Sequence, residues 1–321
     1  MPRSTPVLLA LLSSCASSGS ETLSAREEGP YVLVLGTAQD GGLPQIGCDD
    51  AHCRRARQDG GFARLVTSLL LVDPRTGSRW LFDASPDLPR QVERMRGHPS
   101  TRALPGPRPA LVDGVFLTHA HMGHYAGLLH LGPEAYGARD VPVFATPRMS
   151  AYLRTNGPWS LLVEGGTIRP IDLAPGDTRE LAPDLSVSAI RVPHREEFTD
   201  TVAFLVRGPR RSLLYLPDID KWERWSTRVE DVLAMVDVAL LDASFFDAGE
   251  VPGRDLADIP HPFVVESLAR FAALPAAERA KVRFTHLNHT NPVVDPESEA
   301  AARVRAAGMG VARDGDRFEL D

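Results

Sequence analysis

The sequence has no long apolar stretch and lacks the short motifs that identify several common enzyme classes. No run approaches the roughly 20 apolar residues that a membrane-spanning helix needs, and no internal repeat of solenoid length is present. A Gly-x-Ser-x-Gly elbow, a phosphate-binding loop and a dinucleotide-binding fingerprint are also missing. Any chemistry must therefore be sought in other residues.

Cysteine is scarce, and acidic residues outnumber basic ones. The 321 residues include three cysteines, and the formal net charge is −7. This charge argues against a nucleic-acid partner held by phosphate neutralisation. A hydrophobic content of 43% and a charged content of 24% are typical of a globular protein with a sizeable core. Because no segment has the composition of a linker, we expect residues 30–321 to form a single domain.

The N-terminal segment has the composition of an export signal. Arg3 precedes an apolar run, Val7 to Leu12, and "LSSC" follows, which resembles a bacterial lipobox ending at Cys15. We expect residues 1–14 to be a signal peptide, Cys15 to be lipidated, and residues 15–29 to be a flexible tether. The protein would then be anchored to a membrane of the bacterial cell envelope, facing the periplasm or the exterior. The alternative is a cleaved signal, or an unstructured tail, with an incidental cysteine.

Short apolar runs alternate with helical segments along the rest of the chain. Ten strands are expected, over residues 31–36, 67–73, 79–84, 114–119, 141–146, 185–192, 201–207, 212–218, 236–243 and 281–287. Five helices are expected, over residues 86–97, 124–131, 147–155, 262–273 and 297–306. This order fits an α/β fold in which two facing mixed sheets carry helices outside, a four-layer αββα sandwich.

Potentially reactive side chains end several of these strands. They are Asp83, His119, His194, Asp218 and His286. Ligand sites lie where strand ends release their loops, so the recurrence predicts one site at a sheet edge.

A histidine cluster follows the fourth expected strand. "THAHMGH" places His119, His121 and His124 within six residues at a strand-to-helix turn. Neutral imidazole binds Zn, Mn, Fe or Ni, and the i, i+2 pair His119 and His121 can face one cation while His124 faces a second. The cluster therefore predicts a metal site.

The loop resembles the HxHxDH signature of the metallo-β-lactamase fold superfamily, and the other motifs of that family follow in order. Asp83 matches the aspartate that orients the metal loop, His194 and His286 match two later histidines, and Asp218 matches the bridging aspartate. The resemblance implies that His119, His121, His194 and Asp218 hold one cation, and that His124, Asp218 and His286 hold another.

Gly123 departs from this signature, because the family has an aspartate there that ligates the second metal and holds the attacking water. We therefore expect a weakened second site, in which Asp83 or a substrate group compensates. Gly123→Asp is expected to raise the occupancy of that site.

Two further stretches resemble the pyrroloquinoline-quinone biosynthesis protein B and cyclic ribosyl-phosphate phosphodiesterase branch. They are "VLGTAQDGGLPQIGCDDAHC" (34–53) and "NHTNP" (288–292). The resemblance implies a structural zinc held by Cys48, Asp50, Cys53 and His289, with His52 as a spare ligand. The alternatives are a Cys48–Cys53 disulfide, favoured by export, or free thiols.

The resemblance also implies a role for His261, which would donate a proton to a leaving oxygen; the alternative is a helix-capping histidine. The expected function is hydrolysis of a phosphodiester or ester-type small molecule by a metal-bound hydroxide. Asp218, Asp83 and His261 would assist, and the metal would be zinc, with manganese or iron as alternatives. The resemblance to the quinone-biosynthesis protein B family implies, as an alternative, an Fe(II)- and O₂-dependent hydroxylase. A third hypothesis is a non-catalytic metal- or ligand-binding lipoprotein.

Overall fold

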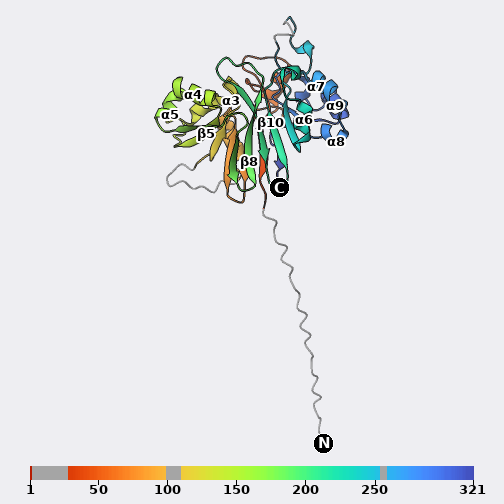
Figure 1. Ribbon diagram of the computed structural model, residues 1–321. Helices are drawn as coiled ribbons and strands as arrows, with labels where there is room; N and C mark the ends of the chain where they lie inside the picture. The colour runs from red at the N-terminus through yellow and green to blue at the C-terminus, as the bar shows by residue number, and fades with distance from the viewer. Residues whose placement is uncertain (2–27, 99–109, 254–258) are drawn as a thin grey trace.

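Two seven-stranded sheets form the centre of the protein (Figure 1). The computed structural model describes residues 1, 28–98, 110–253 and 259–321. The expected signal peptide, the lipidation site Cys15 and all but the end of the tether lie outside the described residues. No helix within these ranges has the length and apolar content to cross a bilayer.

Each sheet mixes parallel and antiparallel neighbours. The first has the order β14 (Arg317–Glu319), β1 (Tyr31–Gly36), β2 (Ser68–Asp73), β3 (Ser78–Phe82), β4 (Gly114–Phe116), β5 (Val141–Ala145) and β6 (Ile168–Asp172). The second has the order β13 (Gly310–Val311), β12 (Val282–Thr285), β11 (Val238–Asp242), β10 (Ser212–Leu216), β9 (Thr201–Arg207), β8 (Leu185–Val192) and β7 (Thr178–Ala182).

The strands are apolar on both faces because both faces are covered. In β9, Val202 and Phe204 point into the layer between the sheets, whereas Ala203 and Leu205 pack toward the outer helices. The inner layer is rich in aromatic rings. The ring of Phe116 stacks on Phe82 with centroids 4.9 Å apart, and Phe204 meets both rings edge-on.

Helices form the two outer layers. The first sheet is covered by α2 (Leu88–Met95), α3 (Met122–Tyr125), α4 (Pro147–Thr155) and α5 (Trp159–Glu164). The second is covered by α1 (Ala51–Gln58), α6 (Val229–Ala234), α7 (Val264–Phe271) and α9 (Glu299–Ala306), with α8 (Ala276–Arg279) beside them. Figure 1 shows α4 and α5 on one side of the strands and α6 to α9 on the other. The predicted four-layer α/β sandwich is confirmed.

All ten expected strands are present, and the four that were not expected are the edge strands of the two sheets, β6, β7, β13 and β14. The five expected helices are present, although segment 124–131 forms α3 followed by the 3₁₀ helix Ala126–Leu131. The short helices α1, α5, α6 and α8 were not anticipated.

The loop after β1 joins the two sheets at one edge. Ala38 pairs with Val66, just before β2, and also with Leu287, just after β12. The amide of Gln39 donates to the carbonyl of Leu287 at 2.9 Å, and the amide of Leu287 donates to Thr37 at 2.8 Å. Several strands end at this edge. In the first sheet, β3 runs parallel to β4. In the second sheet, β10, β11 and β12 run parallel to one another, and β8 runs parallel to β10 because β9 is antiparallel to both.

Candidate metal centre

The side chains predicted from the strand ends converge at this edge. Asp83 follows β3, His194 follows β8, Asp218 follows β10 and His286 follows β12. Asp83 and His286 have left-handed backbones, with φ of 59° and 58°. This conformation is costly for non-glycine residues and is concentrated at functional sites; here it turns the chain sharply as each strand ends.

One cluster consists of His119, His121 and His194. A ligand atom from each lies within 4.8 Å of the others. His119 Nε2 is 2.9 Å from His121 Nδ1, and the imidazole of His194 is fully buried beside them. Glu197 accepts a hydrogen bond from His121 Nε2 at 3.0 Å and fixes that ring. Three imidazoles in one place match the donor set of a zinc-type site.

Asp218 lies between this cluster and a second one. Its Oδ1 is 3.5 Å from His194 Nε2, and its Oδ2 is 2.8 Å from His124 Nε2 and 3.3 Å from His286 Nε2. Burial opposes ionisation of Asp218, but His286 and His124 hold its pKa well below the usual range. An ionised carboxylate with one oxygen on each side is suited to bridge two cations.

Several of these atoms are buried and make no well-formed hydrogen bond, although carboxylates lie close to some of them. They are both ring nitrogens of His194, Nε2 of His124 and His286, and Oδ2 of Asp218. A buried polar atom left unsatisfied costs about 1–3 kcal/mol. Four of these five atoms are imidazole nitrogens, whose lone pairs can bind a cation. The residues present therefore fit a metal, and the convergence of these side chains is as the sequence predicted, while their roles as ligands remain predictions.

Asp83 contacts the centre through His124 and has no exposed side-chain surface. Its side chain is fully buried, and it accepts hydrogen bonds from the Thr118 amide and hydroxyl, the Tyr215 hydroxyl and His124 Nδ1. These contacts fit the orienting role that was predicted for Asp83. The suggestion that Asp83 compensates for Gly123 by holding water is wrong, because both carboxylate oxygens are already engaged.

A second buried aspartate, Asp242, was not predicted. It ends β11, and its Oδ2 is 2.7 Å from Nδ1 of His261. Burial lowers the pKa of His261, but the Asp242 carboxylate outweighs it and raises that pKa to about 9. Ser244 bonds both Asp242 and Nδ1 of His286. A sequence signal was present, because Asp-Ala-Ser follows both β3 (83–85) and the end of β11 (242–244).

His261 lies in the centre, as expected of a proton donor. It is 5% exposed, with Nδ1 3.7 Å from Asp218 Oδ1 and its ring 5.3 Å from that of His194. His261 does not cap α7. The N-cap of α7 is Phe263, whose backbone amide donates to the Glu266 carboxylate.

The space beside Gly123 is filled by Asp40, a residue that sequence reasoning missed. A Cβ placed on Gly123 would lie 2.1 Å from Asp40 Oδ1 and 3.0 Å from its Cα. The Gly123 amide donates to Asp40 Oδ1 at 3.1 Å. The structure therefore argues against the expectation that Gly123→Asp raises the occupancy of the second site, because the added side chain would collide with a carboxylate already there.

The four residues proposed for a structural zinc are also together. Ligand atoms of Cys48, Asp50, Cys53 and His289 lie within 4.8 Å of one another. Both cysteines are free, so the alternative of a disulfide is not what the structure contains. Asp50 caps α1, accepting from the Cys53 amide at 2.8 Å, and His52 instead contacts the carbonyl of His289.

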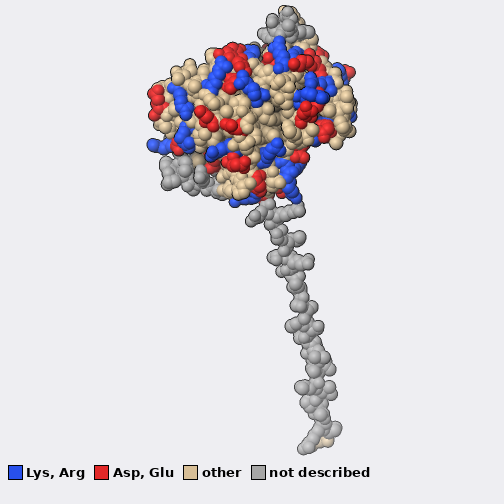
Figure 2. Space-filling model, in the orientation of Figure 1, with Lys and Arg blue, Asp and Glu red and all other residues tan. Residues whose placement is uncertain are grey.

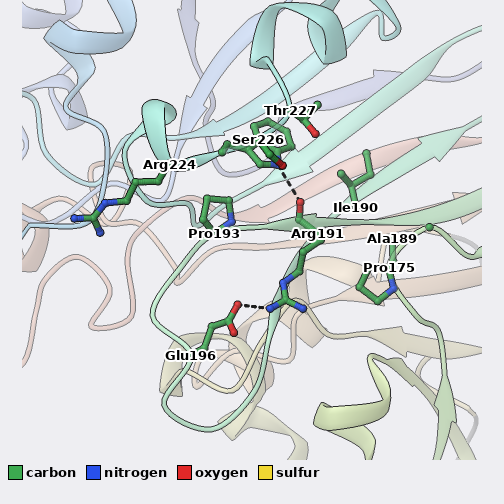
Figure 3. Close-up of a pocket in the computed structure, with 11 residues that line it drawn as sticks. Pro175, Ala189, Ile190, Arg191, Pro193, Glu196, Arg224, Ser226 and Thr227 are labelled. Carbon is green, nitrogen blue, oxygen red and sulfur yellow. Dashed lines mark hydrogen bonds and ion pairs between the residues drawn. The ribbon is translucent and has the colours of Figure 1, made fainter.

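A shallow groove lies beside the centre. Its lining includes Pro193, Arg191, Glu196 and Arg224, and its volume is about 570 Å³ (Figure 3). Arg191 forms an ion pair with Glu196, and Trp225 donates to the Arg191 carbonyl. None of the predicted ligands lines this groove. The face drawn in Figure 2 intersperses acidic and basic side chains.

Comparison with known proteins now decides the family. A family model described as a β-lactamase superfamily domain matches residues 78–290, which contain all of the centre's histidines. The chain belongs to the β-lactamase superfamily. The prediction from the "THAHMGH" loop is confirmed at this level, although that superfamily's usual aspartate is replaced here by Gly123.

Within the β-lactamase superfamily, the chain is similar to coenzyme PQQ synthesis protein B. It is 27% identical to that protein from Methylorubrum extorquens strain PA1, with 90% of this chain and all of the relative covered. The protein from Methylobacterium radiotolerans is 29% identical, with 90% and 99% covered.

Two solved structures share the fold of this chain. Zinc-bound PqqB from Methylobacterium extorquens has a TM-score of 0.73 at 26% identity, with 90% of this chain and all of that chain covered. A diphosphatase of the PhnP family has a TM-score of 0.63 at 22% identity, with 90% and 96% covered, and shares the fold.

Proposed function

We propose that the protein is a metal-dependent hydrolase that acts on a phosphodiester or ester-type small molecule, with zinc as its metal. The observation that carries the proposal is the pair of histidine clusters on either side of Asp218, with buried nitrogens that have no partner. The zinc-bound relative and the diphosphatase that shares the fold support it.

The residues divide the work according to their positions. His119, His121 and His194 would hold one cation, His124 and His286 would hold the other, and Asp218 would contact both. Bound divalent cations supply acidified water and polarise a substrate oxygen. His261, oriented by Asp242, is placed to give a proton to the leaving oxygen.

A second candidate function is Fe(II)- and O₂-dependent hydroxylation. It is favoured by the similarity, over 90% of the chain, to coenzyme PQQ synthesis protein B. A histidine and carboxylate site with open positions can bind Fe(II). The three imidazoles of the cluster of His119, His121 and His194 give its cation a largely nitrogen environment, which is the reason for placing hydrolysis first.

The test begins with metal analysis of protein purified without chelator. Zinc or manganese together with turnover of bis(p-nitrophenyl) phosphate or p-nitrophenyl acetate supports hydrolysis. Iron together with O₂ consumption supports the second candidate and overturns the first. Full metal occupancy with neither activity supports a binding protein instead.

We also propose that the chain is a lipoprotein of the bacterial cell envelope, anchored through Cys15. The support is the order of Arg3, the apolar run and "LSSC". Cys15→Ala should move the protein from the membrane to the soluble fraction of cells and abolish labelling by radioactive palmitate. Membrane association that survives the substitution contradicts the anchor.

A further inference from the structure

We propose that Asp40 is a ligand of the second cation and replaces the carboxylate that the metal loop lacks at Gly123. This inference rests on the proposed function for its metal, but it concerns a residue on a different loop from the metal ligands predicted for the centre. Asp40 follows β1, 83 residues before Gly123.

The position of the Asp40 carboxylate is the first argument. An aspartate at position 123 would begin from a Cβ that lies 2.1 Å from Asp40 Oδ1. That Cβ and the Asp40 carboxylate cannot share the same volume, so the acidic side chain at this place comes from the loop after β1. The backbone amide of Gly123 holds Asp40 Oδ1 in place with a 3.1 Å hydrogen bond.

The neighbours of Asp40 are the second argument. Ligand atoms of Asp40, His124 and His286 lie within 4.8 Å of one another, and Asp40 Oδ1 is 3.8 Å from His124 Nε2. The Nε2 atoms of His124 and His286 are buried and make no well-formed hydrogen bond, although Asp218 Oδ2 lies near both. Both imidazoles are 1% exposed or less, so two unpaired nitrogens and one carboxylate face the same position. Asp218 Oδ2, 2.8 Å and 3.3 Å from these nitrogens, completes a donor set of two imidazoles and two carboxylates.

The Asp40 loop is hydrogen-bonded to the segment that follows β12 and contains His286. The Gln39 amide donates to Leu287, the residue after His286, and the Gly42 amide closes a turn on the Gln39 carbonyl at 2.8 Å. Gly42 has φ of +69°, which glycine adopts without strain. Asp40 is therefore carried on a tight turn whose base is hydrogen-bonded beside His286.

The decisive experiment measures metal content and affinity, not turnover. We compare the wild-type protein, Asp40→Asn, Gly123→Asp and the double variant Asp40→Gly/Gly123→Asp by elemental analysis and by calorimetric titration of the metal-free proteins with Zn²⁺. Asp231→Asn is the matched control, because Asp231 is exposed on α6 and belongs to none of the clusters of possible metal ligands.

We expect Asp40→Asn to lose one zinc equivalent, or to bind it at least about tenfold more weakly, since even groups that only orient a ligand contribute that much. Gly123→Asp, which forces a clash, should show a similar defect. The double variant should recover the equivalent, because removing the Asp40 side chain clears the volume and the Gly123 backbone has no positive φ. Asp231→Asn should match the wild type.

Unchanged zinc content and affinity in Asp40→Asn overturns the inference, as does a gain of zinc in Gly123→Asp alone. Either result leaves the hydrolase proposal standing on the cluster of His119, His121 and His194. Conversely, loss of one equivalent in Asp40→Asn supports the inference even if the wild-type protein hydrolyses no ester, in which case only the proposed function fails.

Discussion

Asp83 Oδ2 and His124 Nδ1 are 2.7 Å apart, and both side chains are almost completely removed from solvent. The hydrogen bond fixes which nitrogen of His124 faces the centre, because Nδ1 is engaged by Asp83 and Nε2 points toward Asp218. Carboxylates that orient a metal-binding histidine in this way raise its basicity and set its tautomer.

Asp83→Asn should therefore lower both the stability of the protein and its metal affinity, although the asparagine side chain has nearly the same size and shape. Every group bonded to Asp83 in the structure can serve as a donor, so an amide NH₂ would face a donor and leave it unpaired. We expect a loss of about 1–3 kcal/mol in the free energy of unfolding of the metal-free protein, and metal binding weakened about 10–100-fold. Urea denaturation and Zn²⁺ titration measure the two effects.

Asparagine accepts the left-handed backbone of position 83, so a backbone penalty does not confuse this result. An Asp83→Asn protein as stable as the wild type, with unchanged metal affinity, would show that the buried hydrogen bonds do not orient His124.

His119→Ala should remove the cation held by the first cluster. His119 is 1% exposed and touches both His121 and Asp218, so no other side chain can replace its nitrogen. We expect metal affinity and any hydrolytic rate to fall by about 100-fold or more, at the upper end of the effects of orienting residues. His130→Ala is the control, because His130 is exposed on the 3₁₀ helix Ala126–Leu131 and should change neither quantity.

Cys53→Ser should abolish stabilisation by zinc at the proposed structural site of Cys48, Asp50, Cys53 and His289. A structural zinc contributes folding free energy directly, and Cys53 is fully buried on α1 near His289. We expect Zn²⁺ to raise the melting temperature of the wild-type protein and of Cys15→Ser, but to raise that of Cys53→Ser less, with one zinc fewer per chain. An equal rise in all three proteins would assign the effect to the active centre alone.

Phe204→Ala should destabilise the layer between the sheets. Phe204 is completely buried, and its ring centroid is 5.6 Å from that of Phe82 and 5.5 Å from that of Phe116. Large-to-small changes of this kind cost about 3–5 kcal/mol. Phe198→Ala, at a ring that is 56% exposed, should cost less than about 0.5 kcal/mol; denaturation of both metal-free proteins tests the difference.

The sequence predicts the centre of each sheet and misses its borders. Most residues of the ten expected strands are buried, and their apolar runs are unambiguous. The border strand β6 contains Pro170, and β7 is mostly exposed, so neither has the composition of a typical strand. Edge strands tolerate proline and charge because half of their hydrogen bonds face outward, and this same tolerance hides them from pattern analysis.

The sequence predicted the site residues that follow an apolar strand. It did not predict residues whose role is visible only from their neighbours in the folded protein. His119, Asp218 and His286 follow apolar strands directly, and parallel strands bring such ends together. Asp242 was missed because its strand was expected to continue to residue 243. Asp40 was missed because only three-dimensional contact shows that a side chain in a glycine-rich turn fills the volume beside Gly123.

The double pairing of Ala38, to Val66 in one half of the sandwich and to Leu287 in the other, has a consequence for how an ion is acquired. Backbone pairing joins the two sheets at the edge where the possible metal ligands lie. The distance between the two sheets at this edge is therefore fixed by backbone hydrogen bonds before any ion binds. Metal uptake should therefore need little rearrangement, and crystals of the protein stripped by chelator should superimpose on those of the loaded form around this rim.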